Sequence, residues 1–339
     1  MIIVDTNYYS YKCVTDVLIK TTLRYIADKP KFKNLSMTFY VRKDADIFMS
    51  HGCADKNYRE IHKCEHLKKF KLILVPGPFL KRKLIRLGIE DSRIACVGWP
   101  KLDPLFSQLR RWTPNPNYKT ILWVPTHNKS RYYLERSISS YPKLKLNYDI
   151  LRNINGINFK VSVHPKNKFQ KRVTLDKLVA CDYVIADSGS TIYEAWALGK
   201  PVIFPDWIVK DNIINNLPGS AEEYIYSNNI GYHASNIHEM KILLSSNLII
   251  EDDVKEFMED YLPSKFNGVS GKVVHNEIKK FFKGKKRKGN RNFSLNTKEN
   301  FNNIVSSDTN NSNMMCSSLI LGILTIVFLL FLINRKIIS

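Results

Sequence analysis

Residues 182–204 read DYVIADSGSTIYEAWALGKPVIF, and this stretch decides the fold class. Its first apolar run, at 183–186, has the length of a buried strand, and IYEAWALG at 192–199 has the spacing of a helix. KPVIFPD at 200–206 is again a strand. A strand, a polar turn, a helix and a second strand predict a βαβ unit with parallel strands.

The same alternation continues on both sides of this unit. A Pro/Asn-rich stretch without periodicity, TPNPN at 113–117, interrupts it and is the expected interdomain linker. We therefore predict an α/β protein with two Rossmann-like domains that face each other across a cleft: a reduced one over 1–112 and a second over 113–283. Further strands are expected at 37–42, 45–50, 72–75, 93–99, 119–124 and 157–163, and further helices at 14–26, after the Pro-Gly-Pro turn at 76–78, and at 174–180.

The last part of the chain differs from the alternating body. Residues 314–333 read MMCSSLILGILTIVFLLFLI, without a charged side chain. At about 1.5 Å per residue, a helix of this length spans the roughly 30 Å hydrocarbon layer of a bilayer. We expect a transmembrane helix over 314–334, tethered to the body by a flexible basic and polar linker over 284–313.

A basic run precedes this helix. Eight Lys and Arg side chains, with no acid among them, fall between positions 279 and 291 and supply 8 of the net charge of +21. The run suits a solvated linker, and it also suits attraction to anionic lipid headgroups, worth roughly 1 kcal/mol per basic residue. Nucleic acid is not an expected partner, because no aromatic residues interleave with 283–288 and no nucleic-acid-binding motif precedes them.

Composition excludes several other classes of protein. Hydrophobic content of 44% and charged content of 24% fit a folded chain, not a disordered one. The six cysteines lack CxxC spacing, which argues against a zinc site or a disulfide framework. The opening residues MIIVDTNYYSYK do not have the form of a secretory signal. We therefore expect a single-pass tail anchor with the body on the cytosolic side.

Polar side chains follow the predicted strands, at the end of a parallel sheet where ligands bind. Ser188, Gly189, Ser190 and Thr191 lie between a strand and a helix. Their hydroxyls, the glycine and the free N–H groups of the helix suit a phosphate, although an ordinary helix N-cap has the same composition.

Three further residues are candidates. Glu194 either closes a capping box with Thr191 or accepts hydrogen bonds from ribose hydroxyls. His164 follows a strand and could donate to a phosphate oxygen. His51 holds the equivalent place in the first domain, where an imidazole could act as a general base toward an acceptor hydroxyl.

Several strings together resemble the CDP-glycerol glycerophosphotransferases, GT-B-fold enzymes of teichoic-acid-type polymer synthesis. Each string is weak alone, and their order and spacing over about residues 45–280 carry the resemblance. They are SHG at 50–52, VGWPKLDPL at 97–105, ILWVPTH at 121–127, VHP at 163–165, the stretch at 182–204, and FNGVSGKVV at 266–274.

The resemblance implies a GT-B-like fold whose second domain holds the donor nucleotide. It implies His51 as the catalytic base, and it implies no metal or other cofactor, because helix N-termini and side chains neutralise the leaving diphosphate. The implied diphosphate contacts are His164, Ser188, Ser190 and Thr191, with Thr126 and His127 nearby.

The chain also departs from that family. Only 50 residues precede His51, and Cys53 replaces the usual threonine. The family's Asp-Tyr-Ser-Ser turn is DSGS at 187–190, which is more similar to the DSGG turn and following glutamate of UDP-N-acetylglucosamine 2-epimerases.

The sequence thus predicts a membrane-anchored transferase. It would move a glycerophosphate or sugar unit from a CDP- or UDP-activated donor to a glycan or lipid-linked acceptor. Two alternatives stay open: a UDP-N-acetylglucosamine 2-epimerase-like enzyme, and a non-catalytic GT-B scaffold tethered to a membrane.

Overall fold

The computed structural model of the chain describes residues 3–4, 35–41, 44–55, 64–127, 137–164 and 175–282. All of them belong to one compact unit, residues 1–287. The predicted helix at 14–26, the linker at 284–313, the transmembrane helix at 314–334 and most of the basic run lie outside the described residues. Every helix in the described ranges is too short or too polar to cross a bilayer.

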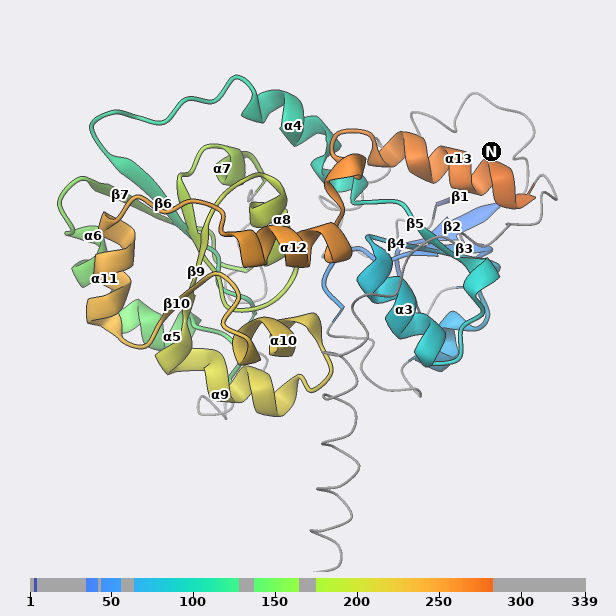
Figure 1. The fold of residues 1–339 in the computed structure, drawn as a ribbon, viewed down its shortest axis with the longest axis horizontal. Coiled ribbons are helices and arrows are strands. Elements are labelled where there is room, and N and C mark those ends of the chain that lie inside the picture. The colour runs from blue at the N-terminus through green and yellow to red at the C-terminus, as the bar shows by residue number, and fades with distance from the viewer. Residues whose placement is uncertain are drawn as a thin grey trace, which may run out of the picture. The chain divides into compact units, whose positions relative to one another are not determined.

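Two five-stranded parallel sheets form the framework (Figure 1), which confirms the predicted α/β class. The first sheet has the strand order β1-β2-β3-β4-β5, and the second has the order β10-β9-β8-β6-β7. The strands of the first sheet are β1 (Ile3–Val4), β2 (Ser36–Thr38), β3 (Ile47–Met49), β4 (Leu72–Val75) and β5 (Ile94–Cys96). Those of the second are β6 (Lys119–Trp123), β7 (Ile157–Val161), β8 (Tyr183–Ile185), β9 (Val202–Pro205) and β10 (Tyr232–Ala234).

Helices connect the consecutive strands of the second sheet, as parallel pairing favours. In the first sheet α3 (Pro78–Arg86) joins β4 to β5, and Gly77-Pro78 starts it where the sequence predicted a turn. The remaining helices are α4 (Asp103–Leu109), α5 (Tyr141–Leu144), α6 (Tyr148–Arg152), α7 (Leu175–Val179), α8 (Ser190–Ala197), α9 (Asp206–Asn216), α10 (Ala221–Ser227), α11 (Ile237–Ser245), α12 (Asp252–Tyr261) and α13 (Ser270–Phe282).

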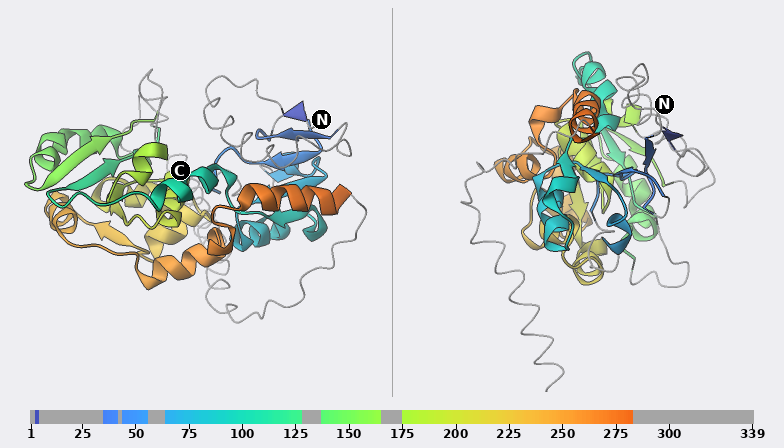
Figure 2. Two further views of the ribbon diagram at one scale, coloured as in Figure 1. Left: turned by 90° about the horizontal axis from the view of Figure 1, so that it is seen from above. Right: turned by 90° about the vertical axis from the view of Figure 1, so that its right-hand side faces the viewer.

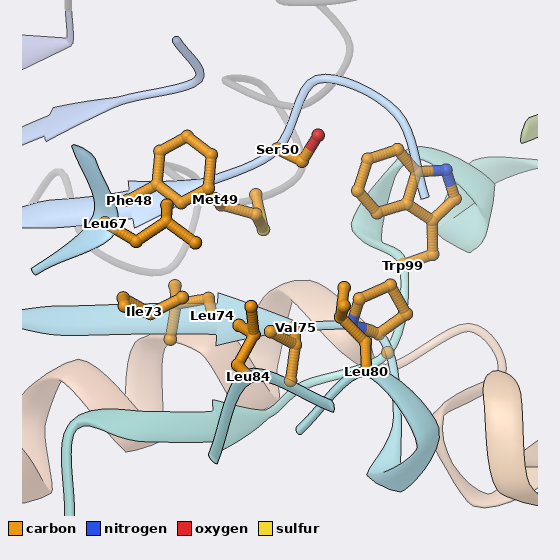
Figure 3. A pocket seen from close by; sticks show the side chains of 12 residues that line it. Phe48, Met49, Ser50, Leu67, Ile73, Leu74, Val75, Leu80, Leu84 and Trp99 are labelled. Carbon is orange, nitrogen blue, oxygen red and sulfur yellow. The ribbon is translucent and has the colours of Figure 1, made fainter. Parts of the chain in front are cut away.

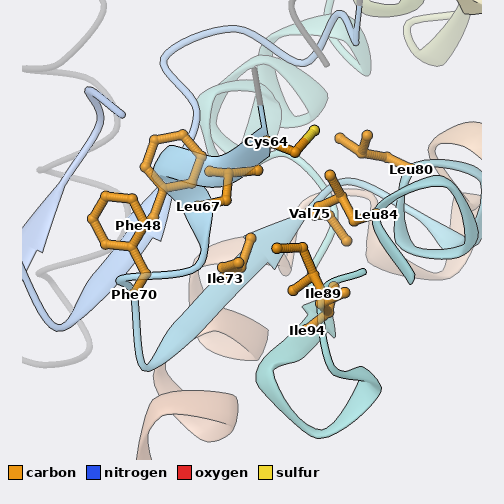
Figure 4. Packing of buried hydrophobic residues seen from close by; sticks show 10 residues of the cluster. All are labelled: Phe48, Cys64, Leu67, Phe70, Ile73, Val75, Leu80, Leu84, Ile89 and Ile94. Carbon is orange, nitrogen blue, oxygen red and sulfur yellow. The ribbon is translucent and has the colours of Figure 1, made fainter. Parts of the chain in front are cut away.

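The core of the first sheet lies between its strands and α3 (Figure 4). Ile73 and Val75 of β4 pack with Leu80 and Leu84 of α3, and Phe70 stacks on Phe48 at 5.0 Å. These side chains are almost fully buried, and burying a Leu or Phe side chain contributes about 1.5–3 kcal/mol. Strands of a parallel sheet are normally buried on both faces and are therefore apolar throughout, and the apolar runs of this sequence match that pattern.

The last two described helices pack against the first half of the chain. The helix α12 contacts both α3 and α8, and α13 contacts β4. Figures 1 and 2 show α13 lying along the first sheet in views from two sides. The two halves are therefore joined both by residues 110–118, where the sequence predicted a linker, and by this second crossing.

Candidate functional site

Two histidines meet at the carboxyl ends of β6 and β7. His127 follows β6 and His164 follows β7, and these two strands pair directly. Their ring centroids are 4.9 Å apart with an interplanar angle of 40°. Both side chains are half-buried. The sequence predicted both as phosphate-side residues, and the strand pairing brings them together.

A buried aspartate fixes the neighbouring loops. Asp187 Oδ1 accepts hydrogen bonds from the backbone N–H of Thr126 at 2.8 Å and of Ser188 at 2.7 Å. Its Oδ2 accepts from the backbone N–H of Ser140 at 2.7 Å and from the Ser140 hydroxyl at 2.9 Å. One carboxylate therefore holds the loops after β6 and β8 and the start of α5 in a single arrangement.

Burial has an electrostatic consequence for this group. Asp187 is fully buried, and burial raises the pKa of its carboxyl above the ordinary value, although hydrogen bonds from Ser140 and Thr126 oppose the shift. Asp187 therefore acts as an internal acceptor, away from solvent.

The helix α8 begins directly after this turn. Gly189 has φ of +98°, a conformation that favours glycine, and Ser190 is the first helical residue. The Ser188 hydroxyl is buried and has no hydrogen-bond partner among the described residues. A buried polar group without a partner costs about 1–3 kcal/mol, and a ligand oxygen at this position would remove that cost.

A second carboxylate reaches the same helix end. Glu222, fully buried at the start of α10, accepts the Gly189 N–H at 3.1 Å through Oε1. Sequence reasoning missed Glu222, because a glutamate 33 residues beyond the turn carries no local signal. Its negative charge opposes a phosphate at this end of α8.

Glu194 is engaged by the first half of the molecule. Its Oε1 accepts a hydrogen bond from Lys101 Nζ at 2.6 Å and from Trp99 Nε1 at 3.2 Å. Glu194 is 2% exposed and Lys101 9%. No side-chain cap forms at the start of α8, as a capping box would require, and the pair joins α8 to the Trp-Pro-Lys string of residues 99–101.

The predicted base His51 lies on a loop that also contacts α8. Tyr40 stacks on the His51 ring at 5.6 Å. Farther along the loop, the Ala54 N–H donates to Ser190 Oγ at 3.3 Å. The structure therefore brings the His51 loop from the first sheet to the first residue of α8. Thr191 lies half-buried in the first turn of that helix.

A small cavity lies in the first half, lined in part by Ser50, next to His51, and by Trp99, which donates to Glu194. It lies between the carboxyl ends of β3 and β4 and the side chain of Trp99 (Figure 3). Its volume of about 10 Å³ has room for about one water molecule, and its walls are mostly apolar. It is a packing gap and cannot hold a nucleotide.

The fold was compared with known proteins. No family model and no curated protein matches the sequence. Among solved structures, the wall teichoic acid polymerase TagF matches with a TM-score of 0.53 and 14% identity, over 70% of this chain and 68% of that one. A histidine variant of TagF gives 0.52 and 14%, over 73% and 74%. The chain has a GT-B-type fold.

A match to an epimerase is weaker. The UDP-N-acetylglucosamine 2-epimerase of Methanocaldococcus jannaschii, solved with UDP-GlcNAc and UDP, matches at 15% identity over 80% of this chain and 82% of its own. Its TM-score is 0.44, below that of the TagF match. The TagF match confirms, at the level of the GT-B fold, the resemblance that the sequence motifs indicated.

In this GT-B fold the predicted site residues form two groups. His127, His164, Thr126 and Ser188 lie at the carboxyl ends of three adjacent strands of the second sheet. His51 lies on a loop of the first sheet that reaches Ser190. Sequence reasoning missed the residues that connect the loops and the two halves: Lys101, Ser140 and Glu222.

Proposed function

We propose that this protein is a membrane-anchored GT-B-type transferase. It moves a glycerophosphate or sugar unit from a CDP- or UDP-activated donor to a hydroxyl of a glycan or lipid-linked acceptor. The main support is the unpartnered, buried Ser188 hydroxyl beside the start of α8, in the turn after β8; β8 pairs with β6, the strand that leads to His127.

The geometry supports a donor diphosphate at these strand ends. The Ser188 hydroxyl has a proton to donate, and the rings of His127 and His164 add donors that become cationic when protonated. The leaving group is CMP when CDP-glycerol donates a glycerophosphate unit, and UDP when a UDP-sugar donates its sugar. In either case the phosphate oxygen at which the bond breaks gains about one negative charge, and fixed donors in a water-poor site stabilise such charge most effectively. His51 would accept the proton of the acceptor hydroxyl from the opposite sheet.

Thermal stability of the full-length protein tests donor binding. We expect CDP, CDP-glycerol, UDP or UDP-N-acetylglucosamine to raise the Tm, because a ligand at a hundred times its Kd stabilises by about 2.7 kcal/mol. S188A and H164A should reduce the shift, whereas S245A, on the exposed end of α11, should keep it. An unchanged shift in S188A would contradict the placement of the diphosphate.

Turnover tests the catalytic role and the reaction type. H51A should abolish transfer and keep nucleotide binding; retained transfer would exclude His51 as the base. Incubation with UDP-N-acetylglucosamine alone separates an epimerase from a transferase, since epimerisation needs no acceptor.

A non-catalytic scaffold is the second candidate, and Glu222 is the observation that favours it. Its buried carboxylate accepts a hydrogen bond from the Gly189 N–H, at the helix end that would face a phosphate. E222Q keeps an acceptor oxygen and removes the charge, so a functional donor site should bind nucleotides more tightly in this variant. Failure of all four nucleotides to shift the Tm of both the wild type and E222Q would support the scaffold.

A further inference from the structure

The loop that carries His51 makes two hydrogen bonds to one residue of the second half. The Ala54 N–H donates to the Ser190 hydroxyl at 3.3 Å, and the Cys53 thiol donates to the Ser190 carbonyl at 3.5 Å. The partners are 136 and 137 residues apart in the chain. Ser190 is therefore a direct link between the two sheets.

Gly52 shows how close this approach is. Its φ lies outside the left-handed region, so the backbone conformation does not require glycine. A Cβ at this position would lie 2.6 Å from Ser190 Oγ, closer than real Cβ contacts allow. A side chain at position 52 would therefore displace the Ser190 hydroxyl from its hydrogen bond with Ala54.

The rest of the loop is fixed by the second half as well. The Tyr261 hydroxyl donates to the Cys53 carbonyl at 2.8 Å, and Asp55 Oδ1 accepts the Ala221 N–H at 2.9 Å. Cys53 and Asp55 are buried. Residues 53–55 thus have one defined position relative to α8, and His51 lies two residues before them.

We propose that Ser190 is a positioning residue that sets the place of His51 relative to the donor-side helix. The proposal rests on the transferase function given above. The Ser190 hydroxyl oxygen accepts from Ala54, so this side chain is engaged by the His51 loop. Because a misplacement of about 1 Å can cost about a hundredfold in rate, this link affects the chemical step more than binding.

Two alanine variants on the same turn separate positioning from phosphate binding. We expect S190A to lower kcat by about tenfold or more and to leave the Kd for the donor nucleotide nearly unchanged. S188A should mainly weaken nucleotide binding. The proposal is overturned if S190A weakens binding as much as S188A does and keeps its kcat.

A second pair of variants tests the same contact by thermal stability and needs no activity assay. G52A should lower the Tm, because its methyl group meets the Ser190 hydroxyl. G52A/S190A should recover much of that loss, since the nearest remaining atom, Ser190 Cβ, is 3.9 Å away, an ordinary contact. G52A should also lower kcat in an active enzyme.

The Tm of the double variant and the transfer assay test different parts of the proposal. Additive Tm losses in G52A/S190A would overturn the contact and with it the positioning role. Rescue of the Tm in a protein that transfers no unit from any donor would establish the contact, but overturn the transferase function and the positioning role of Ser190 in it.

Discussion

The Asp187 carboxylate receives four hydrogen bonds in the fully buried turn after β8. In D187N one oxygen remains to accept from Thr126 and Ser188, but the amide NH₂ faces the Ser140 donors. Each buried donor left unpaired costs about 1–3 kcal/mol. We predict a lower urea midpoint for D187N and reduced nucleotide binding; an unchanged midpoint would contradict the role assigned to Asp187.

The raised pKa of Asp187 gives a pH dependence whose sign is defined. The folded state binds this proton more tightly than the unfolded state does. The contribution of Asp187 to the free energy of unfolding is therefore largest below the ordinary Asp pKa of about 3.9. It decreases as the pH rises through the raised pKa of Asp187 in the folded state. Urea titrations between pH 3 and 7, compared between wild type and D187N, measure this contribution as the difference in slope.

Sequence reasoning worked for residues that follow strands and failed for their distant partners. His127, His164 and Ser188 could be placed because apolar runs end just before them and parallel strands end at one edge. Lys101 and Glu222 could not, because their partners are 93 and 33 residues away and only the folded chain brings them together.

At the scale of elements, the strands were predicted better than the last helices. The run at 72–75 is β4 with the predicted bounds, and α7 is one residue shorter at each end than expected. No prediction covered the elements after β9. Of these, β10 has only three residues, and α13 forms by packing on a sheet near the other end of the sequence.

The start of α13 depends on a residue from the first half. Asp103 accepts the N–H groups of Ser270 at 3.1 Å and Gly271 at 2.7 Å, and so caps the helix that returns to β4. Replacing a capping carboxylate with alanine costs about 1 kcal/mol. We predict that D103A speeds amide exchange in the first turn of α13 and lowers the Tm, whereas D103N does so less. Unchanged exchange at 270–273 would refute the cap.

At the scale of the whole molecule, the halves share buried polar contacts. The Lys101–Glu194 pair joins them directly, and the Asp55–Lys83 pair belongs to the first half and contacts the second; the side chains of both pairs are at most 11% exposed. Lys83 Nζ also donates to the Gly219 carbonyl at 2.7 Å, while Asp55 accepts the Ala221 N–H. This ion pair therefore holds both sides of the turn that leads into α10.

Removing one partner of that pair should separate the halves. K83M leaves the Asp55 carboxylate buried without its counter-charge, which costs about 3–5 kcal/mol, whereas replacing both partners is often much less costly. We predict a single cooperative urea transition for the wild-type body, a markedly lower midpoint or two separate transitions in K83M, and partial recovery in D55L/K83M. K83R, which keeps the charge, should lie near the wild type. A double variant as unstable as the sum of D55L and K83M would show that these two side chains are not energetically coupled.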